Sequence, residues 1–552
     1  MSFFHHFDSS GEAKEEFPRI TTDITEQQFK KRKNGLKILL IHLPIREWSY
    51  PNIFPIGHGY VASVAMMDGH SVSVLDLNAE RRVPVDSADA IVELIEKRVP
   101  EMIRELTPDL IGFGGIITQY ALIKHTIRLC KSLSPKTPVV LGGGIGSSMP
   151  EFMLRFIGAD IIVQEEGEAT FSELLFRLEN ETSLHGLQGT VFKRGDQVHN
   201  NGLRPSIKSG TQGLDRLPWP ARSLYAIEEV YSLNPVGHLN WENKWSDGRA
   251  SSTKKSLSLL GSRGCPYAKS ACDYCYASYL GETYRLRSPS DVADEMFYLR
   301  ERYGAEYQHF LDDLFLTNWR WVLQFCDELE KRVVSSGKLI EWGSTCRTNI
   351  VADDVVRAKK TGRKNFVERA KEVGLRHIGF GVESASPTVL KMIDKSGQTI
   401  EKMEIAITEV QNILGYADCS FMIGSPGETV DSVRETVEFC KSVDLRPEVF
   451  FYTTAYPGTE FWGLAEEKGL ISKAVTGKIG PSDDQIVEKY MLMLGEQGSH
   501  VRTNFSELPD EEVLQLAKWA TGELNPTETK FKTEPHSGDR QPLSLSANRA
   551  SV

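Results

Sequence analysis

Short apolar strands alternate with amphipathic helices along most of this chain, and the first block of them constrains the fold most. Five buried strands are predicted there, over residues 36–42, 72–77, 108–114, 138–144 and 159–163. Continuous apolar strands with helices between them predict a doubly wound parallel sheet. A ligand is expected beyond the carboxyl ends of such strands. No Gly-x-Gly-x-x-Gly segment follows a strand, which argues against a dinucleotide.

A second block of alternation follows a linker that contains Leu217-Pro218-Trp219-Pro220. The closely spaced prolines prevent regular structure there. Six strands are predicted in the second block, over residues 256–261, 307–311, 341–346, 376–382, 419–423 and 449–453. Because amphipathic helices separate them, we expect a parallel barrel, complete or partial, with catalytic residues at the strand carboxyl ends.

The predicted fold class is therefore α/β, and changes in composition divide the 552 residues into six parts. These are a loose arm (1–35), a Rossmann-like domain (36–200), a linker (201–255), a partial (β/α)6 barrel (256–465), a small, mostly helical C-terminal region (466–524) and a disordered tail (525–552).

Charge and hydropathy exclude some classes of partner. The net charge of −11 argues against a nucleic-acid or membrane-surface partner. No apolar run approaches the roughly 18 residues of a membrane span. The start of the chain lacks the apolar core of a secretory signal, so we expect a cytoplasmic protein.

Three of the eight cysteines lie in one short stretch, as Cys265, Cys272 and Cys275, whereas the other five are scattered among apolar segments. Scattered free cysteines are typical of a protein core. Three clustered thiolates are too few for a four-coordinate zinc site, but they suit an iron–sulfur cluster with one iron open for a ligand. A zinc site completed by a distant histidine is the alternative, although no second Cys-x-x-Cys is present.

The segments around and after these cysteines resemble the radical S-adenosylmethionine (SAM) enzymes. The resemblance is carried, in order, by Gly264–Tyr267, Phe310–Phe315, Cys346–Asn349, Gly379–Ser384, Met422–Thr429 and Tyr456–Thr459. The first domain resembles the cobalamin-binding domain that is often fused to such barrels. In layout and mass the chain is most similar to the P-methyltransferases of phosphinothricin-type antibiotic biosynthesis.

The resemblance implies a set of cofactor contacts. The three clustered cysteines would hold a [4Fe–4S] cluster whose open iron binds SAM. SAM would be contacted by Tyr274 and Ile423 near the adenine, Asp312 or Asp313 at the amino group, Arg347 at the carboxylate, and Glu383 at the ribose or the amino group. Cobalamin would lie against Thr118, Gly142, Gly143 and Gly144.

The cobalamin site is expected to lack an axial histidine, because the Asp-x-His-x-x-Gly segment that supplies one in other cobalamin proteins is missing. His42, His58 and His70 are candidate contacts without that motif context.

The spacing of the cysteines departs from the family pattern. Six residues separate Cys265 from Cys272, where the family usually has three. Closing a loop longer by three residues costs only a few tenths of a kcal/mol in chain entropy, roughly, so the cluster is still expected. The insertion contains Lys269, which either meets an anionic substrate or is a solvated loop residue. Further cations predicted at the barrel mouth are Arg263, Arg285 and Arg376.

The function that the resemblance implies is a cobalamin-dependent radical SAM methyltransferase. SAM would be cleaved reductively with electrons from an external flavodoxin- or ferredoxin-type donor. The radical would activate a small-molecule substrate, and methylcobalamin would donate the methyl group. The narrower expectation is methylation of a P–H phosphinate. The alternatives are methylation of carbon, cyclisation or rearrangement without methyl transfer, and a non-catalytic zinc-binding protein.

Overall fold

The structure is a computed structural model that describes residues 35–45, 50–82, 88–234, 254–268, 272–276, 283–395, 397–494 and 503–525. The predicted arm and tail therefore lie almost entirely outside the described residues, and so does Lys269. None of the helices in the described ranges is long and apolar enough to cross a membrane.

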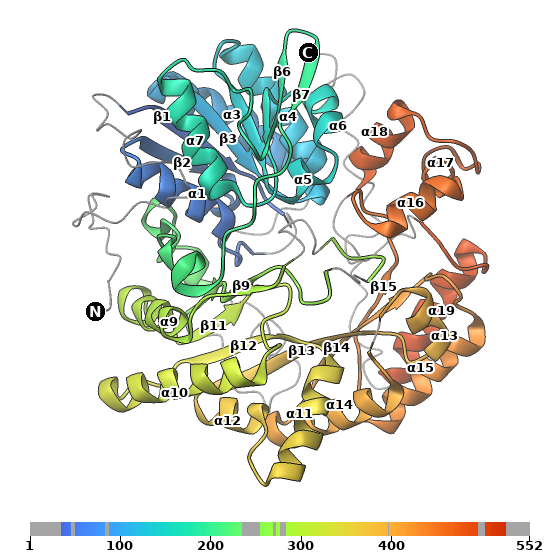
Figure 1. Ribbon diagram of the computed structural model, residues 1–552. Helices are drawn as coiled ribbons and strands as arrows, with labels where there is room; N and C mark the ends of the chain where they lie inside the picture. Colours follow the sequence, from blue (N-terminus) through green and yellow to red (C-terminus); the bar gives the residue numbers. More distant parts are fainter. Residues whose placement is uncertain are drawn as a thin grey trace.

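The first domain is built on a seven-stranded sheet in the order β2-β1-β3-β4-β5-β6-β7 (Figure 1). Its strands are β1 (Lys37–His42), β2 (Ser71–Asp76), β3 (Leu110–Gly114), β4 (Val139–Gly142), β5 (Ile161–Val163), β6 (Thr190–Arg194) and β7 (Gln197–Asn200). The first five are parallel, and this confirms the predicted doubly wound sheet. The antiparallel pair β6 and β7 was not among the predicted strands.

Helices cover both faces of this sheet because successive strand residues point to opposite sides. Leu39 and Ile41 pack into a core with α3 (Ala88–Leu106) and α4 (Tyr120–Leu133). Ile38 and Leu40 pack into another core with α1 (Ile56–Met67) and α7 (Gly167–Glu179). Burial on both faces explains the continuous apolar runs of the sequence.

The second domain is an open half-barrel of six parallel strands in the order β15-β14-β13-β12-β11-β8. They are β8 (Ser256–Leu259), β11 (Tyr307–Phe310), β12 (Glu341–Cys346), β13 (Leu375–Glu383), β14 (Asp418–Ile423) and β15 (Phe450–Tyr452). The outer layer contains α9 (Pro289–Tyr303), α10 (Trp319–Ser336), α11 (Thr348–Thr361), α12 (Phe366–Glu372), α13 (Pro387–Met392), α14 (Ile400–Leu414) and α15 (Val430–Ser442). The sheet does not close, because β8 and β15 are its two edges.

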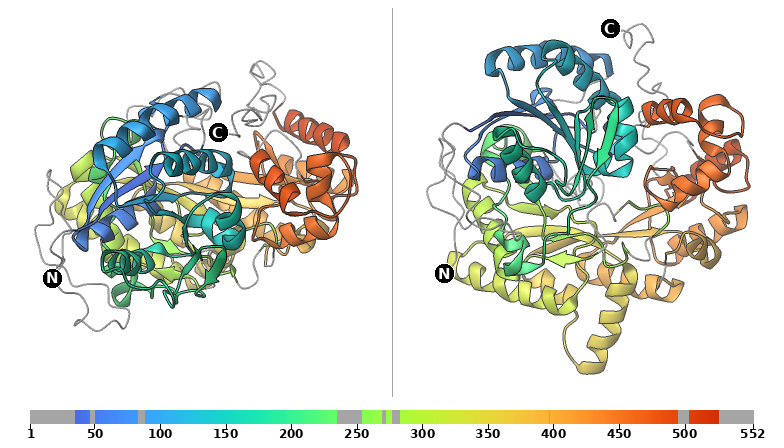
Figure 2. Two further views of the ribbon diagram at one scale, coloured as in Figure 1. Left: turned by 90° about the horizontal axis from the view of Figure 1, so that it is seen from above. Right: turned by 45° about the horizontal axis from the view of Figure 1, so that its top comes forward.

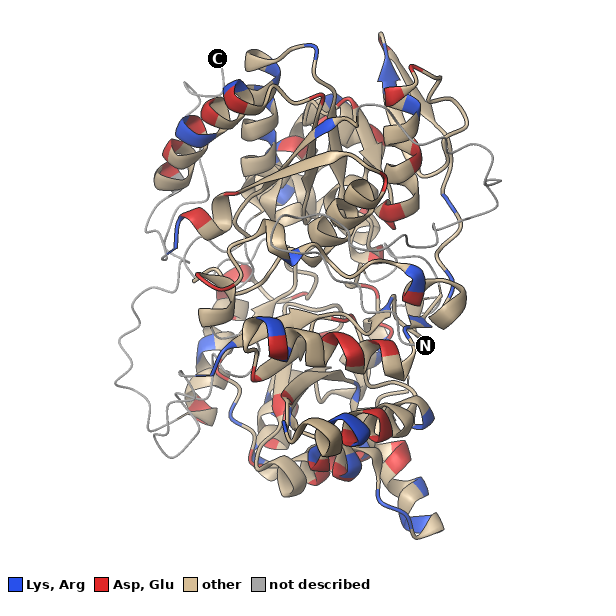
Figure 3. Cartoon of the chain, turned by 90° about the vertical axis from the view of Figure 1, so that its left-hand side faces the viewer, with Lys and Arg blue, Asp and Glu red and all other residues tan. Residues whose placement is uncertain are grey.

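Local signals set the ends of these helices. The hydroxyl of Ser288 accepts a hydrogen bond from the Asp291 amide at the start of α9, which satisfies an otherwise unpaired helix donor. The same helix ends at Gly304, whose φ of 71° is left-handed and favours glycine. Basic and acidic residues are interspersed along the helices in the view of Figure 3.

The C-terminal region links the two domains. It contains α16 (Glu460–Glu467), α17 (Leu470–Thr476), α18 (Asp484–Met493) and α19 (Asp510–Leu524), and α19 packs against α15 of the half-barrel. In contrast, α18 lies beside the first domain (Figure 2), where Asp484 pairs with Arg155 at 2.7 Å and Glu488 pairs with Lys124. Because α17, α18 and α19 lie within residues 466–524, the predicted mostly helical C-terminal region is confirmed.

Candidate active site between the two sheets

The three clustered cysteines lie on one loop at the carboxyl end of β8. The loop leaves β9 (Ser262–Arg263) and returns through β10 (Arg285–Leu286), and these two short strands pair with each other. All three thiols are half-buried, and the Cys275 amide donates to the Cys272 carbonyl at 2.8 Å. Burial raises the pKa of Cys265, so cluster binding must displace its proton.

The donor set fits an iron–sulfur cluster chemically, because it consists of three accessible thiols on one loop. No group of three or more Cys, His, Asp or Glu side chains in the described ranges is arranged to hold a metal ion. The loop is nevertheless anchored from both sides. The Asp273 amide donates to the Ile393 carbonyl at 3.2 Å, and the Asp273 carbonyl accepts from the Phe461 amide at 3.0 Å. Thiolates on an anchored loop, with no fourth protein thiol beside them, match a cluster with an open iron.

The two candidate aspartates after β11 have different surroundings. Asp312 is buried and accepts hydrogen bonds from the Gly261 amide at 3.1 Å and from the Ser262 hydroxyl. Burial raises the pKa of Asp312 to about 7. Asp313 is exposed. Asp312 therefore ties the end of β8 to the end of β11, and Asp313 is the carboxylate that is open to a ligand.

Tyr274 and Glu383 form a buried network with Lys395, which the sequence analysis missed. The Tyr274 hydroxyl donates to Glu383 Oε1 at 3.0 Å, and Lys395 Nζ donates to the same oxygen at 2.8 Å and to the hydroxyl at 2.7 Å. Glu383 ends β13 with a left-handed φ of 66°, a strained conformation of the kind that clusters at functional sites. Lys395 follows α13, and Tyr274, whose hydroxyl it contacts, lies 121 residues earlier in the sequence.

Arg347 and Ile423 occupy different environments at the strand ends. The Arg347 guanidinium stacks on the Tyr267 ring at 3.9 Å, and the amide of Asn349 donates to the Tyr267 hydroxyl at 2.8 Å. The Gly-Cys-Pro-Tyr segment is thereby tied to the end of β12. The Ile423 side chain is in the apolar core between sheet and helices, so only its backbone can face a ligand at the strand end.

Three cations that the sequence predicts at the barrel mouth are occupied in ion pairs. Arg263 pairs with Glu166 at 2.8 Å and with Glu168 at 2.5 Å, and Arg285 pairs with Glu166 at 2.5 Å. All four groups are buried. Arg376 lies near the amino end of β13 and pairs with Glu341 at 3.3 Å. Arg263 and Arg285 lie at the barrel mouth, where partners distant in sequence neutralise their charges, whereas the predicted position of Arg376 is wrong.

The paired arginines fix the cysteine loop against the first domain. Arg263 and Arg285 face each other across β9 and β10, at the base of the loop, and their acidic partners follow the carboxyl end of β5. Burial alone would raise the pKa of Glu168, but attraction to Arg263 outweighs it and holds that pKa below its usual range. The carboxyl ends of both sheets therefore converge on one region.

The predicted cobalamin contacts lie at the carboxyl ends of β3 and β4. Gly143 has a φ of 79°, and a Cβ there would come within 2.7 Å of the Gly115 carbonyl oxygen, so only glycine fits. Thr118 lies in a short 3-10 helix (Ile117–Gln119) that follows β3, and its buried hydroxyl has no hydrogen-bond partner among the described residues. Close backbone approach and an unsatisfied buried hydroxyl both fit a bound ligand at this edge.

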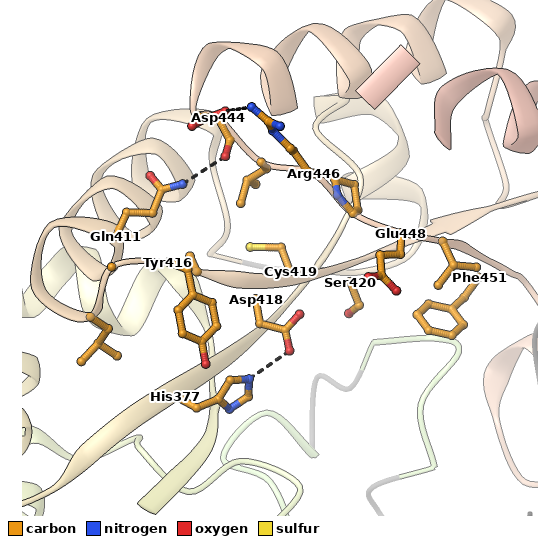
Figure 4. A pocket seen from close by; sticks show the side chains of 16 residues that line it. His377, Gln411, Tyr416, Asp418, Cys419, Ser420, Asp444, Arg446, Glu448 and Phe451 are labelled. Carbon is orange, nitrogen blue, oxygen red and sulfur yellow. Dashed lines mark hydrogen bonds and ion pairs between the residues drawn. The ribbon is translucent and has the colours of Figure 1, made fainter. Parts of the chain in front are cut away.

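A large cavity lies elsewhere, at the amino ends of the barrel strands. It has a volume of about 890 Å³ and is lined by residues that include Tyr416, Asp418 and Glu448. Figure 4 shows Asp418 pointing toward His377, with which it pairs at 3.0 Å. Because the cysteine loop is at the opposite ends of these strands, this cavity is not part of the candidate active site.

Comparisons with known proteins agree with both domains. The B12-binding domain family matches residues 48–175, and the Radical SAM superfamily matches residues 259–440. An uncharacterised methyltransferase of Pyrococcus horikoshii is 28% identical over 79% of this chain and 84% of its own length. The cytidylyl-2-hydroxyethylphosphonate methyltransferase of Streptomyces wedmorensis is 23% identical over 76% of this chain and 79% of its own length.

Solved structures share the fold. The radical SAM methyltransferase TsrM from Kitasatospora setae, with tryptophan and a SAM analogue bound, superimposes with a TM-score of 0.58 at 18% identity, over 81% of this chain and 78% of TsrM. The cobalamin-dependent radical SAM enzyme OxsB gives 0.56 at 17% identity, over 88% of this chain and 61% of OxsB. The chain therefore combines a B12-binding domain with a domain of the Radical SAM superfamily, and its cofactors are a [4Fe–4S] cluster, SAM and cobalamin.

Proposed function

We propose that this enzyme transfers a methyl group from SAM, through cobalamin, to a non-nucleophilic centre of a small molecule held between the two sheets. The observation that carries the proposal is the buried contact of Arg263 with Glu166 and Glu168, which places the cysteine loop against the ligand edge of the B12-binding domain. When bound, the cluster and SAM supply a radical and cobalamin supplies the methyl group.

The chain's own residues would hold and orient these groups. Cys265, Cys272 and Cys275 would ligate the cluster, and exposed Asp313 would accept hydrogen bonds from the SAM amino group. Lys395 and Glu383, a predicted SAM contact, form a buried ion pair at 2.8 Å. Lys395 can pair with the SAM carboxylate, and Glu383 with the SAM amino group, in place of each other. Because both side chains are already buried, this exchange costs little further desolvation free energy.

Lys395→Met is expected to weaken SAM binding about ten- to a hundredfold, because it removes a buried cation and leaves Glu383 uncompensated. Binding is measured anaerobically on the reconstituted protein by the change that SAM causes in the electron paramagnetic resonance (EPR) spectrum of the reduced cluster. Lys391→Met, on the exposed side of α13, is the matched control. Equal SAM affinity in both variants would remove Lys395 from the site.

The narrower proposal for the substrate is a P–H phosphinate that becomes a P–CH₃ product. It is supported by the similarity to a methyltransferase that acts on a phosphonate compound. Of the cations predicted at the barrel mouth, Arg263, Arg285 and Arg376 are paired. The proposal therefore assigns phosphinate recognition to Lys269 in the insertion, and Lys269 itself lies outside the described residues.

Incubation of the reconstituted enzyme with a P–H phosphinate, SAM and a low-potential reductant is expected to give a new P–CH₃ signal by phosphorus NMR. A sample without cobalamin is the control. Consumption of the phosphinate without that signal would contradict the narrower proposal and leave methyl transfer to other centres intact.

Reaction without methyl transfer is the second candidate, because anaerobic magnesium-protoporphyrin IX monomethyl ester cyclases are also similar. The cyclase of Cereibacter sphaeroides is 24% identical over 78% of this chain and 65% of its own length. SAM with a deuterated methyl group separates the two candidates. A product heavier by one CD₃ group identifies a methyltransferase, and an unlabelled product identifies the other reaction.

A further inference from the structure

Two buried histidines lie at the point of the first sheet where ligands bind in folds of this type. His42 ends β1, and His58 is in the first turn of α1. The strand order is β2-β1-β3-β4, so the connection after β1 runs to β2 on one side, whereas the connection after β3 runs to β4 on the other side. A crevice forms at the carboxyl ends of strands at such a switch point. The His58 ring leans over Gly114, the last residue of β3.

Apart from a contact of the His58 ring with the Gly114 backbone, the ring nitrogens of this histidine pair have no hydrogen-bond partner among the described residues. The rings pack edge to face, with centroids 5.5 Å apart, and their residues are only 4% and 8% exposed. Burial lowers the pKa of His58 to about 4, with the nearby Gly114 backbone opposing the shift, and lowers that of His42 as well. Both imidazoles are therefore neutral. His42 has one N–H donor and one acceptor nitrogen unused, and His58, whose ring contacts the Gly114 backbone, has its acceptor nitrogen unused.

Other unsatisfied polar atoms lie along the same edge. They are the Thr118 hydroxyl, after β3, and the Gln164 side-chain oxygen, directly after β5. Buried polar groups without partners destabilise a fold, and native proteins keep few of them unless a ligand or water completes the bonds. In contrast, His70, at the amino end of the sheet, accepts a hydrogen bond from the Leu36 amide at 3.0 Å.

We propose that His42 and His58 hydrogen-bond the primary amide side chains of the corrin ring of cobalamin, and do not coordinate its cobalt. A primary amide offers both donors and acceptors, which complements a neutral imidazole. Flexible amide side chains can reach nitrogens that lie beneath the surface, whereas a cobalt ligand must project from the protein toward the metal. The inference rests on the cobalamin site of this family and extends it to residues outside any cobalamin motif.

The test measures cobalamin affinity and stability of the apoprotein, and neither depends on the cluster, SAM or substrate. His42→Leu and His58→Leu are each expected to weaken binding of hydroxocobalamin about three- to tenfold, the effect of losing one or two hydrogen bonds. Each should also raise the melting temperature of the apoprotein by about 1–3 °C, because an unsatisfied buried polar group is removed. His58→Gln keeps a donor and an acceptor and should retain most of the affinity.

His70→Leu is the matched control, with the opposite expected signs. It should lower the melting temperature, because the Leu36 amide loses its acceptor, and leave the affinity unchanged. Cobinamide, which has the corrin amides but no nucleotide, should lose affinity in parallel with hydroxocobalamin.

Three results would overturn the inference. One is wild-type affinity in both leucine variants, which would make the histidines ordinary core residues. Another is a loss restricted to hydroxocobalamin, which would place the contact at the nucleotide. The third is nitrogen-15 splitting in the EPR spectrum of bound cob(II)alamin when histidine is labelled, which would place an imidazole on cobalt. Methyl transfer could still occur in each case, so the proposed function is tested separately.

Discussion

Cys272→Ala is expected to lose the iron–sulfur cluster and all reductive cleavage of SAM, while cobalamin remains bound. Removing one of three thiolate ligands leaves too few donors for a cluster that needs a ligand at each of three irons. Iron should fall from about four per chain to near zero after anaerobic reconstitution. Formation of 5′-deoxyadenosine should fall at least about a hundredfold, the upper range for weakening a metal site through its surroundings alone.

The control for this variant is Cys326→Ala, which removes a buried core thiol on α10. It should lower the melting temperature but keep iron, cobalamin and SAM cleavage. Cleavage activity retained in Cys272→Ala would contradict the ligand assignment, whereas loss of cobalamin from it would indicate that the variant fails to fold.

Arg263→Met is expected to destabilise the protein by about 3–5 kcal/mol, the usual effect of removing one partner of a buried ion pair. The substitution leaves Glu168 charged and buried without Arg263, while Glu166 keeps Arg285. Because the same arginine ties the cysteine loop to the first domain, methyl transfer should fall more than SAM cleavage. Thermal unfolding measures the loss of stability. The ratio of methylated product to 5′-deoxyadenosine measures how far methyl transfer falls relative to SAM cleavage.

A double variant separates the charge from the contact. Arg263→Met combined with Glu168→Gln removes both partners, so it should recover part of the lost stability without restoring methyl transfer. Arg302→Met is the surface control, because Arg302 and Glu228 are about half exposed and such pairs contribute only about 0–1 kcal/mol. An equal effect of Arg302→Met and Arg263→Met would show that the buried pair has no special role.

The architecture could be predicted because it depends on local patterns. Runs such as Ile38–Ile41 are apolar on both faces, which identifies parallel strands buried between helices, and both sheets follow from that alternation. The β6–β7 hairpin was missed because its residues Lys193, Arg194 and Gln197 are exposed and polar, so the strands lack the apolar signal.

The candidate site could be predicted only in part, because its remaining features depend on residues that are distant in sequence. Nothing near Arg263 reveals that its charge is neutralised by Glu166, 97 residues earlier. Likewise, no neighbouring residue reveals that Asp312 is buried and bonded to the Gly261 amide while Asp313 is exposed. Lys395 was missed for the same reason, since its partner Tyr274 comes from the cysteine loop.

Periodicity and motif spacing are properties of neighbouring residues, so they predict the two α/β domains and the cysteine triplet, and the resemblance that the motifs carry implies the cofactors. Which charges remain for ligands depends instead on contacts between segments that are distant in sequence. Such contacts pair Arg263 and Arg285 with glutamates of the first domain, whereas the buried His42 ring at the switch point has no hydrogen-bond partner among the described residues. Whether a polar side chain can bind a ligand depends on its burial and on its hydrogen-bond and ion-pair partners. Both are set only when segments distant in sequence pack together.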